Sequence, residues 1–82
     1  MSIINEQRRI KLDRARSKYL ATAEDLVRAV LSEEQDAMDN VPENLRESER
    51  HRVMEDGVDA MEDALDNICE ASRLLRSVLE PS

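Results

Sequence analysis

The chain has 82 residues, contains no Phe or Trp and only one Tyr, and carries a formal net charge of −7. A chain this short folds as one small domain, residues 1–82, and a core without large aromatic residues is too thin to enclose an enzymatic cleft. We therefore expect a non-enzymatic protein without a cofactor, built from helices packed side by side.

Cysteine content and hydropathy favour a cytoplasmic protein. Cys69 is the only cysteine, so no internal disulfide forms, which suits a reducing compartment. The N-terminus lacks the basic, apolar and cleavage-site regions of a secretory signal. No apolar run approaches the roughly 20 residues that cross a bilayer. The sequence predicts no membrane association.

The charged residues are unevenly distributed along the chain. Residues 1–32 contain seven bases and four acids, residues 33–70 contain three bases and fourteen acids, and residues 71–82 contain two bases and one acid. The acidic middle would repel nucleic acid, which argues against direct nucleic-acid binding. A basic cluster near the N-terminus is most simply a solvated helix face, although it could touch phosphate. It consists of Arg8, Arg9, Lys11, Arg14, Arg16 and Lys18.

Residues 4–39 are predicted to form the first long helix. Neither Gly nor Pro interrupts this range, and apolar residues recur at steps of three and four. Such a helix would be about 55 Å long at 1.5 Å per residue. Its main stripe is Leu12, Ala15, Tyr19, Ala23, Leu26, Val30 and Ala37, and Leu20, Val27, Leu31 and Met38 widen that stripe on one side.

Residues 40–48 are predicted to connect two helices. Pro42 has no N–H and disfavours a helical residue before it, so the first helix should end near Asn40. The stretch PENL, residues 42–45, is predicted to form one short turn, with Leu45 folded back onto the hairpin end. Ser48 is a favourable N-cap for the next helix.

Residues 49–79 are predicted to form a second helix with a heptad seam. The seam is Met54, Val58, Met61, Leu65, Ile68, Ser72, Leu75 and Leu79. Gly57 lies on a flank of small residues, and a close helix crossing there is expected to offset its cost of about 1 kcal/mol. Carboxylates on the side away from the seam form a predicted partner-binding surface, the acidic face. Its members are Glu55, Asp59, Glu62, Asp63, Asp66 and Glu70.

Together the two helices predict an all-α fold, a long antiparallel, coiled-coil-like hairpin. Both apolar stripes are broader than one helix covers, with Leu74 and Val78 on one flank and Leu20, Val27 and Leu31 on the other. We expect a homodimer that completes a four-helix bundle, although a partner protein would cover the same surface. An antiparallel dimer would bring unlike charges together, and parallel pairing remains open. The expected core and dimer seam is Leu20, Leu26, Val27, Val30, Leu31, Val58, Met61, Leu65, Ile68, Leu75 and Leu79.

No group of residues has the pattern of a catalytic or metal site. His51 is expected to be exposed, and Cys69 to be a small packing residue whose pKa the surrounding acids raise. Glu47 and His51 are four residues apart, but the repeated Glu-x-x-His sets of di-iron bundles are missing. The connecting loop lacks the ligand order of an EF-hand.

The run SEEQDAMDNVPENLRESERHRVMEDGVDAMEDALDNICEA, residues 32–71, resembles a group of short acidic helical-hairpin proteins of bacterial prophages and mobile elements. In that group, an EEQ-A-DN-PE-L--SER loop leads into a helix of repeated A-EDA-D-I-EA type. The resemblance covers about half of the chain and implies a phage context in a bacterial host cell. It also implies a hairpin turn at Asp39, Asn40, Pro42, Glu43, Leu45, Ser48 and Glu49.

Two functional interpretations follow. In the first, the protein is a binding module, a phage-type inhibitor whose acidic face imitates a phosphate array and binds a basic nucleic-acid-handling or defence protein. In the second, it is a structural or adaptor dimer whose acidic face only keeps it in solution. Ionic strength separates the two, because it weakens charge contacts and leaves apolar helix packing intact.

Overall fold

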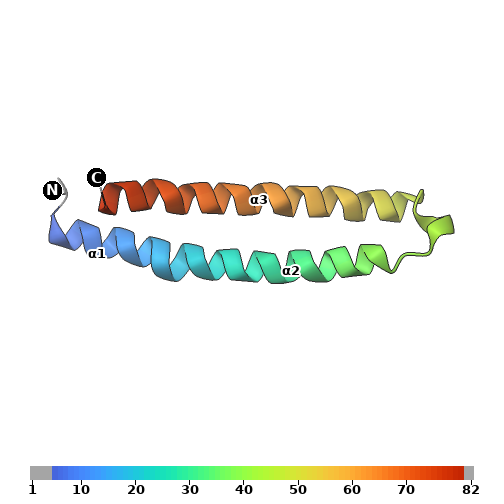
Figure 1. The fold of residues 1–82 in the computed structure, drawn as a ribbon, viewed down its shortest axis with the longest axis horizontal. Coiled ribbons are helices and arrows are strands. Elements are labelled where there is room, and N and C mark those ends of the chain that lie inside the picture. Colours follow the sequence, from blue (N-terminus) through green and yellow to red (C-terminus); the bar gives the residue numbers. More distant parts are fainter. Residues whose placement is uncertain (1–4, 81–82) are drawn as a thin grey trace.

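Two long antiparallel rods joined by a short loop make up residues 5–80, the part of the chain that this computed structural model describes (Figure 1). The first rod consists of α1 (Glu6–Arg14), η1 (Ala15–Leu20) and α2 (Ala21–Asp39), and the second rod is α3 (Glu49–Leu79). The molecule measures 59 × 17 × 17 Å. The prediction of an all-α fold with two long helices is confirmed.

Local hydrogen bonds set the ends of the helices. Asn5 caps α1, since its Oδ1 accepts a hydrogen bond from the N–H of Arg8 at 2.9 Å. Asn40 caps the C-terminal end of α2 two residues before Pro42, as predicted. Ser48 caps α3 as predicted, with its hydroxyl accepting from the N–H of His51 at 3.2 Å. A cap of this kind stabilises a helix by about 1 kcal/mol.

The loop contains the predicted short turn as a single 3-10 turn, η2 (Glu43–Leu45). The N–H of Leu45 donates to the carbonyl of Pro42 at 2.9 Å, and Nε of Arg46 donates to the carbonyl of Val41 at 3.3 Å. The prediction that Leu45 folds back onto the hairpin is wrong, because this side chain is half exposed. Polar contacts of the backbone, rather than an apolar anchor, hold the turn.

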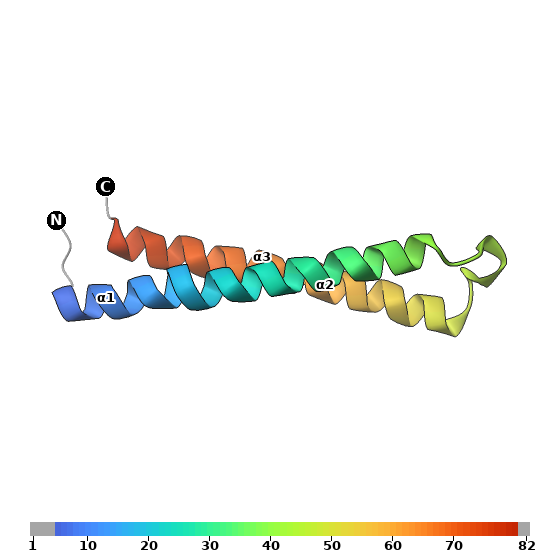
Figure 2. The same ribbon diagram turned by 90° about the horizontal axis from the view of Figure 1, so that it is seen from below.

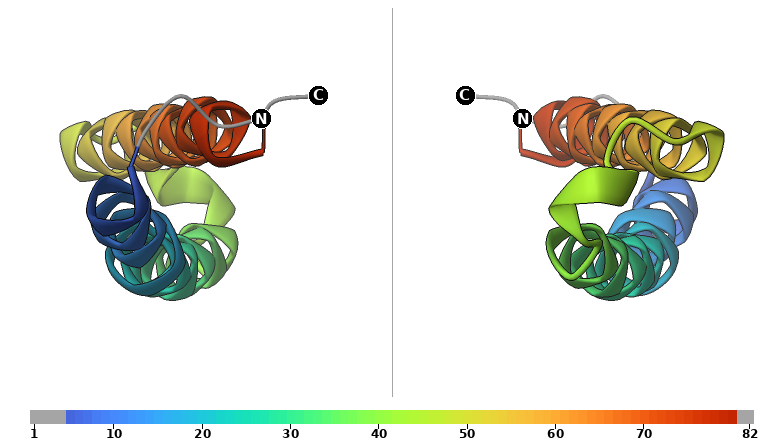
Figure 3. Two further views of the ribbon diagram at one scale, coloured as in Figure 1. Left: turned by 90° about the vertical axis from the view of Figure 1, so that its left-hand side faces the viewer. Right: turned by 90° about the vertical axis from the view of Figure 1, so that its right-hand side faces the viewer.

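A single seam with a thin core holds the two rods together. The rods cross at a shallow angle (Figure 2), and the end-on views show them side by side with the loop closing one end (Figure 3). On α3, the buried residues are His51, Val58, Leu65 and Leu79, all of which share one heptad position. The first rod contributes the half-buried Leu20, Val27, Leu31 and Met38. Met61, Ile68 and Leu75 of α3 are also half-buried.

The main apolar stripe expected on the first rod is not the one that packs most closely against α3. Leu26 is 63% exposed and Val30 is 50% exposed, so these two members of the expected core and dimer seam are not buried within the hairpin. Leu20, Val27 and Leu31, which belong to the same expected seam and were expected to stay partly exposed in a single hairpin, are half-buried. The two stripes are offset by one residue along the helix. The π-helical turn η1 determines which of them faces α3.

The π-helical turn η1 sets which stripe of the first rod faces α3. The N–H of Ala21 bonds to the carbonyl of Arg16, five residues back, so this turn holds one residue more than an α-helical turn. Leu12 and Leu20 are eight residues apart, one more than a heptad, and both are half-buried. The wide turn absorbs the extra residue and keeps both side chains on one side of the rod.

Gly57 does not serve the close crossing that the sequence analysis proposed. A Cβ atom built at this position meets nothing within 4 Å. The position of Gly57 is therefore open within the hairpin, and the contact with α2 does not explain the glycine.

Deletion of Ser17 should convert the π turn into regular α-helix without disturbing the seam. Ser17 is exposed, and its removal leaves Leu12 and Leu20 seven residues apart, the heptad spacing. We expect an unchanged or higher midpoint of thermal unfolding, followed by circular dichroism.

Deletion of Asn67, an exposed residue in the middle of α3, is the matched control. It rotates one half of α3 by about 100° against the other and withdraws buried residues from the seam. It should therefore destabilise the fold by about 2 kcal/mol or more. Equal losses in the two variants would contradict the assigned role of the π turn.

Candidate functional site

The predicted acidic face lies on one exposed side of α3. With Val58 at position a of the heptad and Met61 at position d, positions b and f point away from the seam and position e lies beside it. Asp59, Asp63, Asp66 and Glu70 occupy b and f, Glu55 and Glu62 occupy e, and all six carboxylates are exposed. From Glu55 to Glu70 the acidic face extends about 22 Å along the helix at 1.5 Å per residue. The same helix thus carries the core stripe and the charged surface.

The middle of the acidic face is not neutralised within the hairpin. Asp59, Asp63 and Asp66 form no ion pair with any of residues 5–80. Their neighbour Glu62 accepts a hydrogen bond from Nε2 of Gln35 on α2 at 3.4 Å, a neutral contact that leaves its charge in place. Four adjacent carboxylates therefore act together as a concentrated negative charge.

An arginine pairs with the acidic face at one end, and a histidine contacts it at the other. At one end, Arg73 donates two hydrogen bonds to Glu70, at 2.6 and 3.0 Å. These bonds lower the pKa of Glu70 and raise that of Arg73. At the other end, Oε1 of Glu55 lies 3.0 Å from Nδ1 of His51. Among the six members of the acidic face, Glu70 is therefore the one paired with an arginine within residues 5–80.

His51 is buried, which corrects the prediction that it is solvated. Its residue is 7% exposed because it occupies the same heptad position as Val58 and Leu65. Its Nδ1 contacts Glu55 without the alignment of a hydrogen bond. The carboxylate next to His51 is therefore Glu55 and not Glu47, which is four residues before His51 in the sequence. Residues 5–80 contain no group of three or more His, Cys, Asp or Glu that could hold a metal ion.

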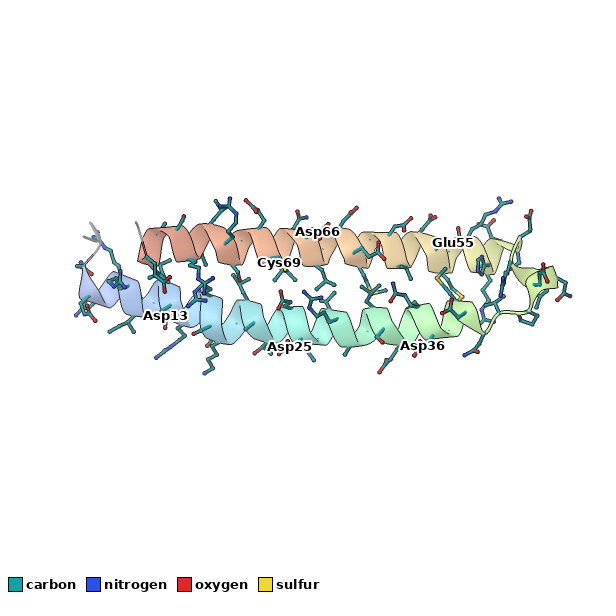
Figure 4. All side chains as sticks on the ribbon, in the orientation of Figure 1. Asp13, Asp25, Asp36, Glu55, Asp66 and Cys69 are labelled. Carbon is teal, nitrogen blue, oxygen red and sulfur yellow. The ribbon has the colours of Figure 1, made fainter. Side chains whose placement is uncertain are left out.

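Cys69 links the two rods through Glu24 and Arg28. Its Sγ donates to Oε1 of Glu24 at 2.8 Å, and Nη2 of Arg28 lies 3.5 Å from the same oxygen. Cys69 lies between the rods, whereas Asp25 and Asp36 lie along the outer side of α2 (Figure 4). The cysteine is exposed, so its assignment as a packing residue is wrong.

The hydrogen bond to Glu24 is the main reason that the pKa of Cys69 is raised, as the sequence analysis expected from nearby acids. The same bond lowers the pKa of Glu24. A thiol with a raised pKa is a poor nucleophile at neutral pH, because the thiolate is the reactive form. We therefore interpret the Glu24–Cys69 contact as a polar link between the rods.

An apolar groove of about 350 Å³ runs between the rods on a second side of the hairpin. It is lined by Leu26, Val27 and Val30 of α2 and by Ala60, Met61 and Ala64 of α3. The apolar stripes of the first rod already predicted that Leu26, Val27 and Val30 form an apolar surface on this helix. Sequence reasoning missed Val53 and Ala60 on α3, although their shared heptad position with the exposed Leu74 was a usable signal.

The groove and the polar contacts occupy opposite sides of the seam. Ala60 and Ala64 of the groove are at heptad positions c and g, which lie on one side of the a and d positions of the seam. Glu62 and Cys69 contact α2 through polar atoms. Both are at heptad position e, on the other side of the seam. The hairpin therefore has an apolar side and a polar side, and the acidic face continues the polar side.

The helices of residues 5–80 include none that is long and apolar enough to cross a membrane. Comparison with known protein families, with curated proteins and with solved structures finds no match.

The raised pKa of Cys69 should be visible in its reaction with iodoacetamide. Because the neighbouring carboxylate disfavours the thiolate, the rate should reach half its maximum at a higher pH than for a free thiol. The variant Glu24→Gln replaces the carboxylate that accepts the thiol hydrogen bond by a weaker, neutral acceptor and should move the profile to lower pH. Asp25→Asn, which removes a carboxylate on the outer side of α2, is the control and should leave the profile in place. Identical profiles for all three proteins would contradict the contact.

Proposed function

We propose that this protein is a non-enzymatic protein-binding module that presents its acidic face to a basic surface of a nucleic-acid-handling or defence protein. The observation that carries the proposal is the run of unneutralised carboxylates Asp59, Asp63 and Asp66, exposed beside Glu62 on a rigid helix. A fixed array of negative charge attracts basic surfaces and accelerates their association.

The concentration of like charge favours recognition over solvation. Carboxylates three or four residues apart on a helix, such as Asp59 and Asp63, repel each other and reduce helix stability. A surface that only maintains solubility does not need this arrangement, because interspersed charges of both signs suffice. The cost of the acidic face is therefore better explained by a partner that contacts it.

The spacing of the carboxylates supports imitation of a phosphate array. Glu55, Asp59, Glu62 and Asp66 recur about every 5 to 6 Å along the helix. This is close to the distance between neighbouring phosphates of a nucleic-acid strand. The phage-type inhibitor role and action in the cytoplasm of a bacterial host belong to the same proposal, since they rest on the resemblance of residues 32–71.

Dimerisation into a four-helix bundle is the second part of the proposal, and the exposed apolar groove supports it. Only three apolar residues within residues 5–80 are buried, Val58, Leu65 and Leu79, which is a small core. A second copy seated on the groove would cover Leu26 and Val30 and enlarge that core. In the alternative function, a structural or adaptor dimer, this contact is the whole role and the acidic face only solubilises.

Neutralising the middle of the acidic face should abolish partner binding. The triple variant Asp59→Asn, Asp63→Asn, Asp66→Asn leaves the seam untouched and removes three negative charges. The matched control Asp25→Asn, Asp36→Asn, Asp39→Asn removes the same charge from exposed residues of α2. Pull-downs from bacterial lysate should yield a partner with wild type and control only, and that partner should elute with added salt.

The same partner on all three baits would show that the acidic face is only a solvated surface. Helix content of each bait, measured by circular dichroism, verifies that a lost partner reflects a lost surface. This outcome would leave the structural dimer as the function.

Leu26→Glu should disrupt the proposed dimer. It places a charge in the apolar groove and should raise the dissociation constant about tenfold or more, equivalent to about 1.4 kcal/mol. Leu45→Glu makes the same change in the loop, where Leu45 is half exposed outside the groove, and should have little effect. Sedimentation equilibrium reads the result. A wild type that stays at the 9.4 kDa of one chain at all concentrations would remove the dimer.

A further inference from the structure

We infer that the second copy lies antiparallel on the apolar groove, with the loop half of each hairpin against the open half of the other. This inference rests on the dimer proposed above and adds the orientation of its partner. Three features carry it: the position of the groove along the hairpin, the area of the apolar side and the distribution of charge.

The groove lies near the middle of the hairpin. Counted from Glu6, Leu26 and Val30 are about 30 and 36 Å along the first rod at 1.5 Å per residue, in a molecule 59 Å long. A two-fold axis through the groove and perpendicular to the rods therefore superposes two hairpins over almost their full length. A groove at one end would instead leave the far ends of both copies unpaired.

One long side of the hairpin is large enough for a stable interface. A side of 59 by 17 Å presents about 1,000 Å² of projected surface. A standard interface needs about 800 Å² from each partner. Exposed apolar residues extend along this side beyond the groove, since Val53 is 61% and Leu74 is 50% exposed. Full-length overlap would cover both of them, whereas contact at the groove alone would not.

The charge distribution selects the antiparallel arrangement. The Glu24–Cys69 contact divides the hairpin near mid-length into an open half, residues 5–24 and 70–80, and a loop half, residues 25–69. The open half contains eight bases and five acids, and the loop half contains four bases and fourteen acids. Parallel copies would set the two acidic loop halves against each other. Antiparallel copies set each acidic half against a basic one.

These charges are close enough to act despite salt. Packed helices have axes about 8–10 Å apart, and the screening length at physiological ionic strength is about 8 Å. Charges in facing halves that border the apolar side therefore act on each other, whereas charges at opposite ends of the dimer are screened. The open side of Gly57, where a Cβ atom meets nothing within 4 Å, gives the second copy room for close approach.

Pulsed dipolar spectroscopy on spin-labelled dimers tests the orientation. In a Cys69→Ser background, a single cysteine is introduced in turn by Asn44→Cys in the loop, Gln7→Cys in α1 or Asp25→Cys near the middle of the first rod. All three positions are exposed, and none lines the groove. Circular dichroism and sedimentation confirm that each labelled protein retains the fold and mass of the Cys69→Ser parent.

In the antiparallel dimer, the distance between the two labels at residue 44 should approach the 59 Å length of the hairpin. The same holds for the labels at residue 7. The labels at residue 25 should lie within two hairpin widths of 17 Å each. Short distances at all three positions would overturn the antiparallel orientation and leave the dimer intact. A monomeric mass and no coupling between labels at any position would overturn the dimer and the orientation together.

Discussion

The seam between two rods of this hairpin can cover only one stripe of each helix, and this limit shapes the rest of the molecule. Without Phe or Trp, the side chains that cross the seam are short, and within residues 5–80 only Val58, Leu65 and Leu79 are buried apolar residues. The regular heptad of α3 fixes which of its sides is left uncovered. One uncovered side is apolar and forms the groove, and the other carries the acidic face. Both candidate interaction surfaces are thus consequences of one packing register.

The same register explains what the sequence revealed and what it concealed. The heptad of α3 is unbroken, so its seam and the outward direction of Asp59 and Asp63 could be predicted by counting residues. The helix ends at Asn40 and Ser48 could also be predicted, because Pro42 and a capping hydroxyl act locally. The six carboxylates of the acidic face are exposed on one side of α3, as their spacing predicts. Their function depends on the partner that contacts them.

The errors arose where tertiary contacts override local pattern. The first rod has two apolar stripes offset by one residue, and the π turn that selects between Leu26 and Val27 has no Gly or Pro to announce it. The polarity of His51 predicts a solvated side chain, but seven-residue spacing from Val58 places it in the seam. Gly57 suggested a close crossing that α2 does not make. In each case the decisive information is which side of a helix meets its neighbour.

The position of the π turn along the first rod determines which of its side chains face α3. If the extra residue moved from η1 toward the loop, every residue it passed would rotate by about 100° relative to α3. Leu26 and Val30 would then enter the seam, while Val27 and Leu31 would rotate toward the polar side, where Arg28 now contacts Cys69 and Glu24. Asp25 and Ala29 would take the places from which Leu26 and Val30 now line the groove. The seam would stay apolar, but the groove would gain a carboxylate, so the position of one helical defect determines whether this side of the hairpin is apolar.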